Sequence, residues 1–262
     1  RKESSAASDV YKRQGVRSRL RLFAAQCILK LATCDAYASL ILPRMGRLSY
    51  ALQDECFQVR MHLLHDLLLY LMRDELPTEF HAAIFLVAFD PEDEPRVQVA
   101  SYTRRLQVLP PIVRHERLER IIVRFLHLLA HHPDLNAESP QTLCSFARYL
   151  EFYLACVACE TNIGVLARFS ACVRTYIDLS PSEPSVENSR PLYAMAELAQ
   201  FLIQRLADNN GWTIYPVDEE APCPKDILRS TGTIARSVLD GEVWELLQQQ
   251  PRRHRDKKTK VA

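Results

Sequence analysis

A cysteine pair and two adjacent histidines are the residues of this chain best suited to metal binding. Cys156 and Cys159 have the spacing of half a zinc site, and His131 and His132 could supply two further ligands. A structural zinc site usually has two such pairs in loops, whereas the segment YLACVACE has the apolar pattern of a helix. We therefore expect buried thiols on a helix, histidines that end a helix before Pro133, no metal and no other cofactor.

The carboxylates and glycines do not form a catalytic motif. Asp90, Glu92, Asp93 and Glu94 fall in a turn between two predicted helices, where general acid or base catalysis would lack a dry pocket that shifts a carboxyl pKa. No Gly-x-Ser-x-Gly sequence occurs, and no two of the six glycines have the spacing of a phosphate-binding loop. We expect a solvated acidic loop, no enzymatic activity and no small-molecule substrate.

The formal net charge of +1 conceals a basic tail. Residues 1–22 have seven basic and two acidic side chains, and residues 251–262 have six basic and one acidic, so the interior has a net charge of −9. A short basic tail can bind DNA phosphates by counterion release, and without an aromatic residue to stack on bases it should do so independently of base sequence. A nuclear import signal and a plain solubilising terminus are the alternatives. The cations of the flexible tail are Arg252, Arg253, Arg255, Lys257, Lys258 and Lys260.

The cysteines and the apolar runs bear on the cellular compartment. Eight cysteines lie at irregular spacing with no secretory signal before them, so we expect reduced thiols inside the cell. The longest unbroken apolar run is Ala82 to Phe89, which is far shorter than the ~20 residues that cross a bilayer. We therefore expect no membrane partner.

From Val16 onward, apolar residues recur at the three-and-four spacing of amphipathic helices. Strand alternation is almost absent, and the breaks are a few residues long, as between antiparallel helix pairs. Asp35 is the expected N-cap of the second helix, in which Pro43 should cause a kink or mark the first turn of a helix. The predicted helices are 16–33, 35–53, 57–73, 77–89, 95–109, 112–132, 141–160, 163–178 and 191–207.

A short motif indicates how these helices are stacked. Asp54 is followed five residues later by Val59-Arg60, and Val16-Arg17 lies 43 residues before that pair, within the ~40–47-residue period of HEAT and armadillo repeats. In such repeats the valine packs between paired helices, while the aspartate and arginine form charge-assisted bonds between neighbouring repeats. An ordinary helix cap is the alternative role for Asp54. We predict an all-α fold, a HEAT-repeat-like α-solenoid of antiparallel helix pairs stacked into a curved superhelix.

Four segments follow from these patterns. Residues 1–14 lack helical periodicity and begin without a methionine, so we expect a non-native or disordered extension of a fragment. Residues 15–229 should form the helical repeats, residues 230–250 a weakly helical C-terminal segment, and residues 251–262 the basic flexible tail.

Five segments in order make the pattern specific, and together they resemble the C-terminal repeat region of a known family. They are VRSRLRLFAAQCILKL (16–31), LQDECFQVR (52–60), AFDPE (88–92), FLHLLAHHPDL (125–135) and ENSRPLYAMAELAQFLI (187–203). Their order and spacing are similar to those of the cohesin-associated sister-chromatid cohesion factors of the precocious-dissociation-of-sisters family over residues 16–229. A generic HEAT adaptor of another complex, of condensin or transport type, would not need the fourth and fifth segments.

The resemblance implies a curved HEAT scaffold that binds the kleisin subunit of cohesin. With the releasing factor and the cohesin acetyltransferase, it would control the maintenance and release of cohesin on chromatin in the nucleus. The family residues that contact the releasing factor belong to the N-terminal half, so none is assigned to a position here.

The basic tail provides a first test. Deletion of residues 251–262 should weaken binding to duplex DNA and flatten its salt dependence, because fewer counterions are released. Binding would be measured by fluorescence anisotropy over a range of salt concentrations, and unchanged binding would contradict a phosphate-binding tail.

Overall fold

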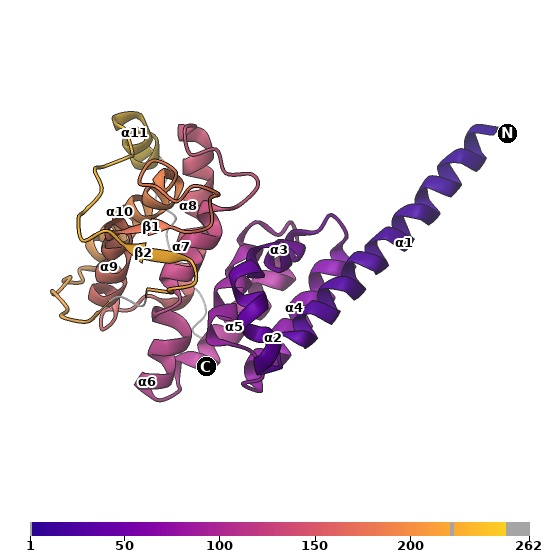
Figure 1. Ribbon diagram of the computed structural model, residues 1–262, viewed down its shortest axis with the longest axis horizontal. Coiled ribbons are helices and arrows are strands. Elements are labelled where there is room, and N and C mark those ends of the chain that lie inside the picture. Colours follow the sequence, from indigo (N-terminus) through magenta and orange to yellow (C-terminus); the bar gives the residue numbers. More distant parts are fainter. Residues whose placement is uncertain (1, 221–222, 250–262) are drawn as a thin grey trace, which may run out of the picture.

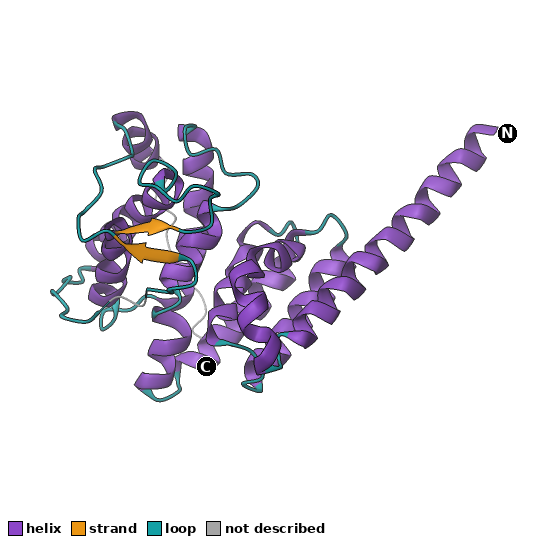
Figure 2. Ribbon diagram, viewed as in Figure 1, coloured by secondary structure: helices purple, strands orange, loops and turns teal. Residues whose placement is uncertain are grey.

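A computed structural model describes residues 2–220 and 223–249 of the chain. Helices pack side by side along the long axis of the molecule, and a small two-stranded sheet lies among the later helices (Figures 1 and 2). The predicted all-α, HEAT-like α-solenoid is confirmed. In the described part of the chain, none of the helices combines the length and the apolar character that a membrane span requires.

The first half of the molecule is built around α4. Its buried residues recur at helical spacing, among them Val59, Leu63 and Leu67, and α1 packs along it (Figure 1). Pro43 lies in the first turn of a 3-10 helix that follows the end of α2, as predicted. The elements are α1 (Lys2–Leu31), α2 (Asp35–Ile41), η1 (Leu42–Arg44), α3 (Met45–Ser49), η2 (Tyr50–Gln53), α4 (Phe57–Met72), η3 (Thr78–Phe89) and α5 (Asp93–Gln107).

In the second half, α10 packs against α7, α8 and α9 (Figure 1). Strands β1 and β2 pair antiparallel, with Ile177 opposite Arg229, and so attach the late chain to these helices. The elements are α6 (Pro111–Arg114), the π-helical turn η4 (His115–Glu119), α7 (Ile122–Ala130), α8 (Pro140–Val157), α9 (Ile163–Cys172), η5 (Val173–Thr175), β1 (Tyr176–Asp178), α10 (Arg190–Asn210), β2 (Leu228–Ser230) and α11 (Gly241–Gln249).

The centre of the core is η3, in which every residue from Phe80 to Ala88 is buried. An apolar run of this kind must be enclosed on all sides, so α4, α5, α7 and α8 all pack against it. Phe85 makes edge contacts with Tyr153, at 4.9 Å between ring centroids, and a tilted contact with Phe125 at 5.7 Å. The apolar run identified in the sequence is therefore core, wound as a 3-10 helix.

Two expectations about helix starts were wrong. The first helix begins at Lys2 and not at Val16, so the backbone of residues 2–14 is helical. Ala, Glu, Lys and Arg in this segment have a high helix propensity. Figure 1 shows these turns projecting away from the body of the protein. The N-cap of α2 is Cys34, whereas Asp35 is the first residue of the helix.

The later boundaries also differ from those expected. The helix expected over 163–178 ends at Cys172, because the chain then extends to pair as β1 with β2. Regular helix ends at Asn210, where Gly211 adopts a left-handed conformation with φ +69°, and the described residues between 212 and 229 form no further helix. Residues 230–250 contain α11. The basic tail, residues 251–262, lies outside the described residues.

A buried histidine in η3 makes folding stability depend on pH. The carbonyl of Thr78 can only accept, so His81 Nδ1 carries the proton (2.8 Å), and His81 Nε2 accepts from the Tyr102 hydroxyl at 2.9 Å. Burial, the largest influence, lowers the pKa of His81 to about 4. The imidazole is therefore neutral in the folded protein at neutral pH.

The sign of the pH effect follows from this shift. Above pH ~6.5 the imidazole is neutral in both states, but below it the unfolded chain gains a proton that the folded chain does not accept until about pH 4. The free energy of unfolding should therefore decrease as the pH is lowered from about 6.5 to 4, by a total on the order of 3 kcal/mol. Urea unfolding from pH 4 to 7 would measure it. His81→Asn cannot titrate and should have a shallower pH slope; parallel slopes would contradict the assignment.

Candidate functional site

An open groove with a volume of about 680 Å³ lies where the ends of η2, η3 and the start of α8 meet. Its floor is apolar and its edge carries several carboxylates, with one arginine between them. Its lining includes Gln53, Asp54, Arg60, Phe89, Asp90 and Tyr149.

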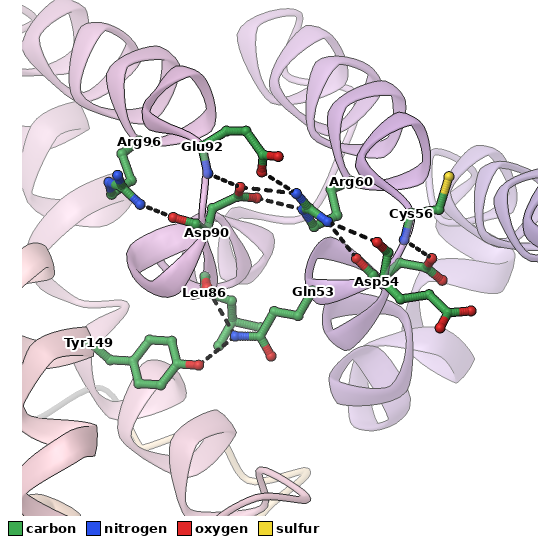
Figure 3. A network of polar contacts seen from close by, with 10 residues as sticks. Gln53, Asp54, Cys56, Arg60, Leu86, Asp90, Glu92, Arg96 and Tyr149 are labelled. Carbon is green, nitrogen blue, oxygen red and sulfur yellow. Dashed lines mark hydrogen bonds and ion pairs between the residues drawn. The ribbon is translucent and has the colours of Figure 1, made fainter.

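Arg60 joins three elements beside this groove (Figure 3). Its Nε donates to Asp90 Oδ2 at 2.8 Å and its Nη2 donates to Asp90 Oδ1 at 3.2 Å, a bidentate pair in which both side chains are at most 8% exposed. Nη2 also pairs with Glu92, and Nη1 donates to the carbonyl of Asp54 at 2.8 Å. One guanidinium thus links α4 to the end of η3 and to the turn after η2.

Burial opposes ionisation of Asp90, but hydrogen bonds from Arg60 and from the Glu92 N–H outweigh it and lower the pKa of this carboxyl. The Asp90 carbonyl in turn accepts from Arg96 at the start of α5. Asp90 is consequently a charged, fully engaged structural group at physiological pH, and not an acid or base free to react.

A second ion pair joins α1 to the same turn. Arg21 Nε donates to Asp54 Oδ2 at 2.6 Å and Nη2 donates to Oδ1 at 2.9 Å. Burial raises the pKa of Asp54, but the Arg21 guanidinium and the Cys56 N–H outweigh it and hold the pKa below its usual range. The sequence motif had assigned this position on α1 to Val16-Arg17. Both residues are exposed, and the cation that reaches Asp54 is Arg21, one helical turn beyond Arg17.

Gln53 lines the groove, and Figure 3 shows its bonds to Leu86 and Tyr149. Its Nε2 donates to the Leu86 carbonyl at 3.0 Å and to the Tyr149 hydroxyl at 2.5 Å, while its Oε1 accepts from His132 Nε2 at 2.6 Å. His132 Nδ1 then accepts the Asp134 N–H. One side chain therefore binds together η2, η3, α8 and the turn after α7.

Aromatic rings form the apolar floor. The rings of Phe89 and Tyr149 are 4.6 Å apart between centroids, and the Arg148 guanidinium lies 4.1 Å from the centroid of Phe89. Phe146 packs on Tyr149 and on His132. Rings held by packing and by hydrogen bonds lose little freedom on binding, so this floor suits an apolar anchor of a partner chain.

Comparison with known proteins agrees with the solenoid geometry. The family described as sister chromatid cohesion protein PDS5 matches residues 2–229 of this chain. The chain belongs to the PDS5 family. The match also begins within the segment 1–14, which we had expected to lie outside the fold.

Individual PDS5 relatives come from fungi and vertebrates. Sister chromatid cohesion protein pds5 of Schizosaccharomyces pombe is 26% identical over 219 residues, covering 83% of this chain and 18% of the relative. Sister chromatid cohesion protein PDS5 of Saccharomyces cerevisiae is 24% identical over 250 residues, covering 87% and 20%. The PDS5 homolog A of Danio rerio is 36% identical over 138 residues, covering 48% and 10%. The chain thus spans about a fifth of the length of the two yeast relatives.

The zinc ligands considered in the sequence do not come together in the described part of this PDS5 segment. Cys156 is buried in α8, and burial raises the pKa of its thiol to about 11, while Cys159 lies beyond the end of that helix. His131 bonds to Asp178 and His132 bonds to Gln53. The two adjacent histidines therefore serve different contacts.

Of the residues that line the groove, the sequence motif contained Asp54 and Arg60, whereas the others were not predicted. Val59 precedes Arg60 in α4, and its side chain is buried. Asp90 was expected in a solvated acidic loop, yet its side chain is 1% exposed, because it directly follows the buried η3 and pairs with Arg60. A carboxylate adjoining a continuous apolar run was the available signal. Gln53 carries no such signal, because its partners are up to 96 residues away.

Arg60, which pairs with Asp90, and Arg21, which pairs with Asp54, allow a matched test of stability. Arg60→Ala leaves the buried Asp90 carboxylate without its cation and should cost about 3–5 kcal/mol of unfolding free energy. Arg60→Lys should cost less. Arg21→Ala removes a cation whose side chain is 39% exposed, so solvent screening limits the loss to less than about 1 kcal/mol. Urea unfolding of the three variants would measure this order, and equal losses for Arg60→Ala and Arg21→Ala would refute it.

Proposed function

We propose that this chain is part of a non-enzymatic PDS5 scaffold that regulates cohesin on chromatin by binding the kleisin subunit, and that the kleisin occupies the groove beside Arg60. The releasing factor and the acetyltransferase of cohesin are proposed as further partners of the whole protein. Family membership and the solenoid fold support this role. The chain spans about a fifth of the length of its yeast relatives, so the family match does not assign partners to this segment, and they are proposed here.

The single observation that carries the proposal is the composition of the groove. Phe89 and Phe146 offer an apolar floor, while Glu55 and Asp134 on the edge have side chains that are 68% and 84% exposed. An acidic edge around an apolar floor is complementary to a polypeptide segment with an apolar anchor flanked by basic residues. The kleisin segment that docks here should have this character.

A reaction is not supported by the same groove. Both Asp90 oxygens and the carboxylate of Asp54 accept bonds from arginines, and both ring nitrogens of His132 are hydrogen-bonded. Proton transfer needs a group that is free to change its protonation state within reach of a substrate. The arrangement therefore favours binding over catalysis.

The apolar face of α1 supports a place within a longer solenoid. Leu20 and Phe23 are 62% and 66% exposed on the side of α1 that α4 does not cover. A neighbouring repeat would bury such a face. A generic HEAT adaptor of another complex is disfavoured by the family match.

The location of the protein and its contact with DNA are part of the proposal. A cohesin regulator works in the nucleus on chromosomes, and the names of the relatives refer to sister chromatid cohesion. The basic tail, with the arginines and lysines between 252 and 260, is proposed to add non-specific DNA contact or an import signal.

Charge reversal on the groove edge tests the kleisin proposal. The double variant Glu55→Lys, Asp134→Lys should weaken binding of kleisin peptides from the same species by about tenfold, because it replaces attraction by repulsion. The matched control reverses two exposed carboxylates remote from the groove, Glu160→Lys and Asp208→Lys. Fluorescence anisotropy with overlapping peptides along the kleisin would measure both.

The full-length protein carrying the same substitutions is the fair second measurement, because an isolated run of repeats lacks its neighbours. Equal binding by the groove variant and the wild type in both lengths would exclude the groove. Equal weakening by the control variant would show that net charge, and not the groove, governs binding.

A further inference from the structure

A polar cluster outside the groove connects α7 to the small sheet. His127 lies in the last turn of α7, His131 follows one turn later, and Asp178 ends β1. The backbone N–H of His131 donates to the backbone carbonyl of His127 at 3.2 Å, so the two residues lie one helical turn apart. Their rings are 4.5 Å apart between centroids. Histidines at positions i and i+4 project from the same face of a helix.

The Nε2 atoms of the two histidines each face one oxygen of the Asp178 carboxylate. His127 Nε2 is 3.2 Å from Asp178 Oδ1, and His131 Nε2 is 2.6 Å from Oδ2. The ligand atoms of all three residues lie within 4.8 Å of one another. A tetrahedral ion with bonds of 2.0–2.1 Å needs ligand atoms about 3.4 Å apart, so small rotations of the side chains suffice.

We propose that His127, His131 and Asp178 bind one divalent transition-metal ion of the zinc class, which fixes β1 to the end of α7. Two imidazoles and a carboxylate are a ligand set that suits Zn²⁺ and its neighbours better than Mg²⁺ or Ca²⁺. The Ser180 hydroxyl, 2.9 Å from His127 Nε2, or a water molecule can complete the coordination. This site is separate from the groove and from the proposed kleisin contact.

The surroundings of the three residues are compatible with an ion. Asp178 is 2% exposed and is held in place by the Ser180 N–H, which donates to its Oδ1 at 2.8 Å. The His131 side chain is 35% exposed, so an ion can enter from that side. The nearby cation Arg124 is paired with both oxygens of Asp226 at 2.9 Å, which offsets its charge.

Binding requires each imidazole to change its tautomer. Without an ion, Nε2–H of each ring donates to the carboxylate; with an ion, the Nε2 lone pair coordinates it and the proton resides on Nδ1. The ion thus takes the place of the two protons that now lie between the rings and Asp178.

Metal titration of the full 262-residue chain, freed of metal by a chelator and dialysis, tests the proposal. Zn²⁺ followed by calorimetry should bind at one ion per chain and raise the melting temperature. Co²⁺ should produce the visible absorption of a site with nitrogen and oxygen ligands. His131→Asn keeps a donor for Asp178 but loses the ring ligand, and should weaken Zn²⁺ binding at least about tenfold while folding normally.

His62 and His65 provide a matched control, because they are exposed on α4, far from this cluster in the fold. The double variant His62→Gln, His65→Gln should bind Zn²⁺ as the wild type does. Absence of saturable binding, equal affinity of His131→Asn and wild type, or a thiolate-to-cobalt charge-transfer band would each overturn the proposal. The last result would place the ion on cysteines.

Discussion

A carboxylate as buried as Asp90 must have a cation beside it, and Arg60 supplies that cation from α4. Removing either partner would leave a charge in a region from which water is excluded, at a cost of several kcal/mol. The pair lies at the end of η3, the continuously buried helix around which α4, α5, α7 and α8 pack. The position of the core helix and the shape of the groove therefore both depend on this one bidentate contact.

The groove is a consequence of how the helix ends are joined. Charged contacts join α1 to the turn after η2 through Arg21 and Asp54, and join α4 to η3 and α5 through Arg60 and Asp90. Gln53 extends the network across the floor to α8. Contacts of this kind between successive helices restrain the surface at the helix ends, and a restrained surface loses less entropy when it holds a partner.

Local patterns in the sequence predicted several of the helices, and they predicted the motif that contains Asp54 and Arg60. The apolar spacing gave α4 and α8 within a few residues, and the distance from Asp54 to Val59-Arg60 identified the motif that forms the joint. Contacts between distant residues were not predictable in this way. Arg21 meets Asp54, and Arg17 one turn earlier on the same face does not, because packing sets the position of Asp54 along the axis of α1. Strand β1 forms only because residues 228–230 return to pair with it. Asp178 meets His127 for the same reason.

Hydrogen–deuterium exchange of the chain with and without its kleisin segment tests the central claim most directly, because it maps the contact without altering any residue. If the kleisin occupies the groove, amide protection should increase in residues 52–60, 86–92 and 141–149, and should stay unchanged in α9 and α10. Protection confined to α9, α10 or the outer face of α1, with no change at the groove, would contradict the account.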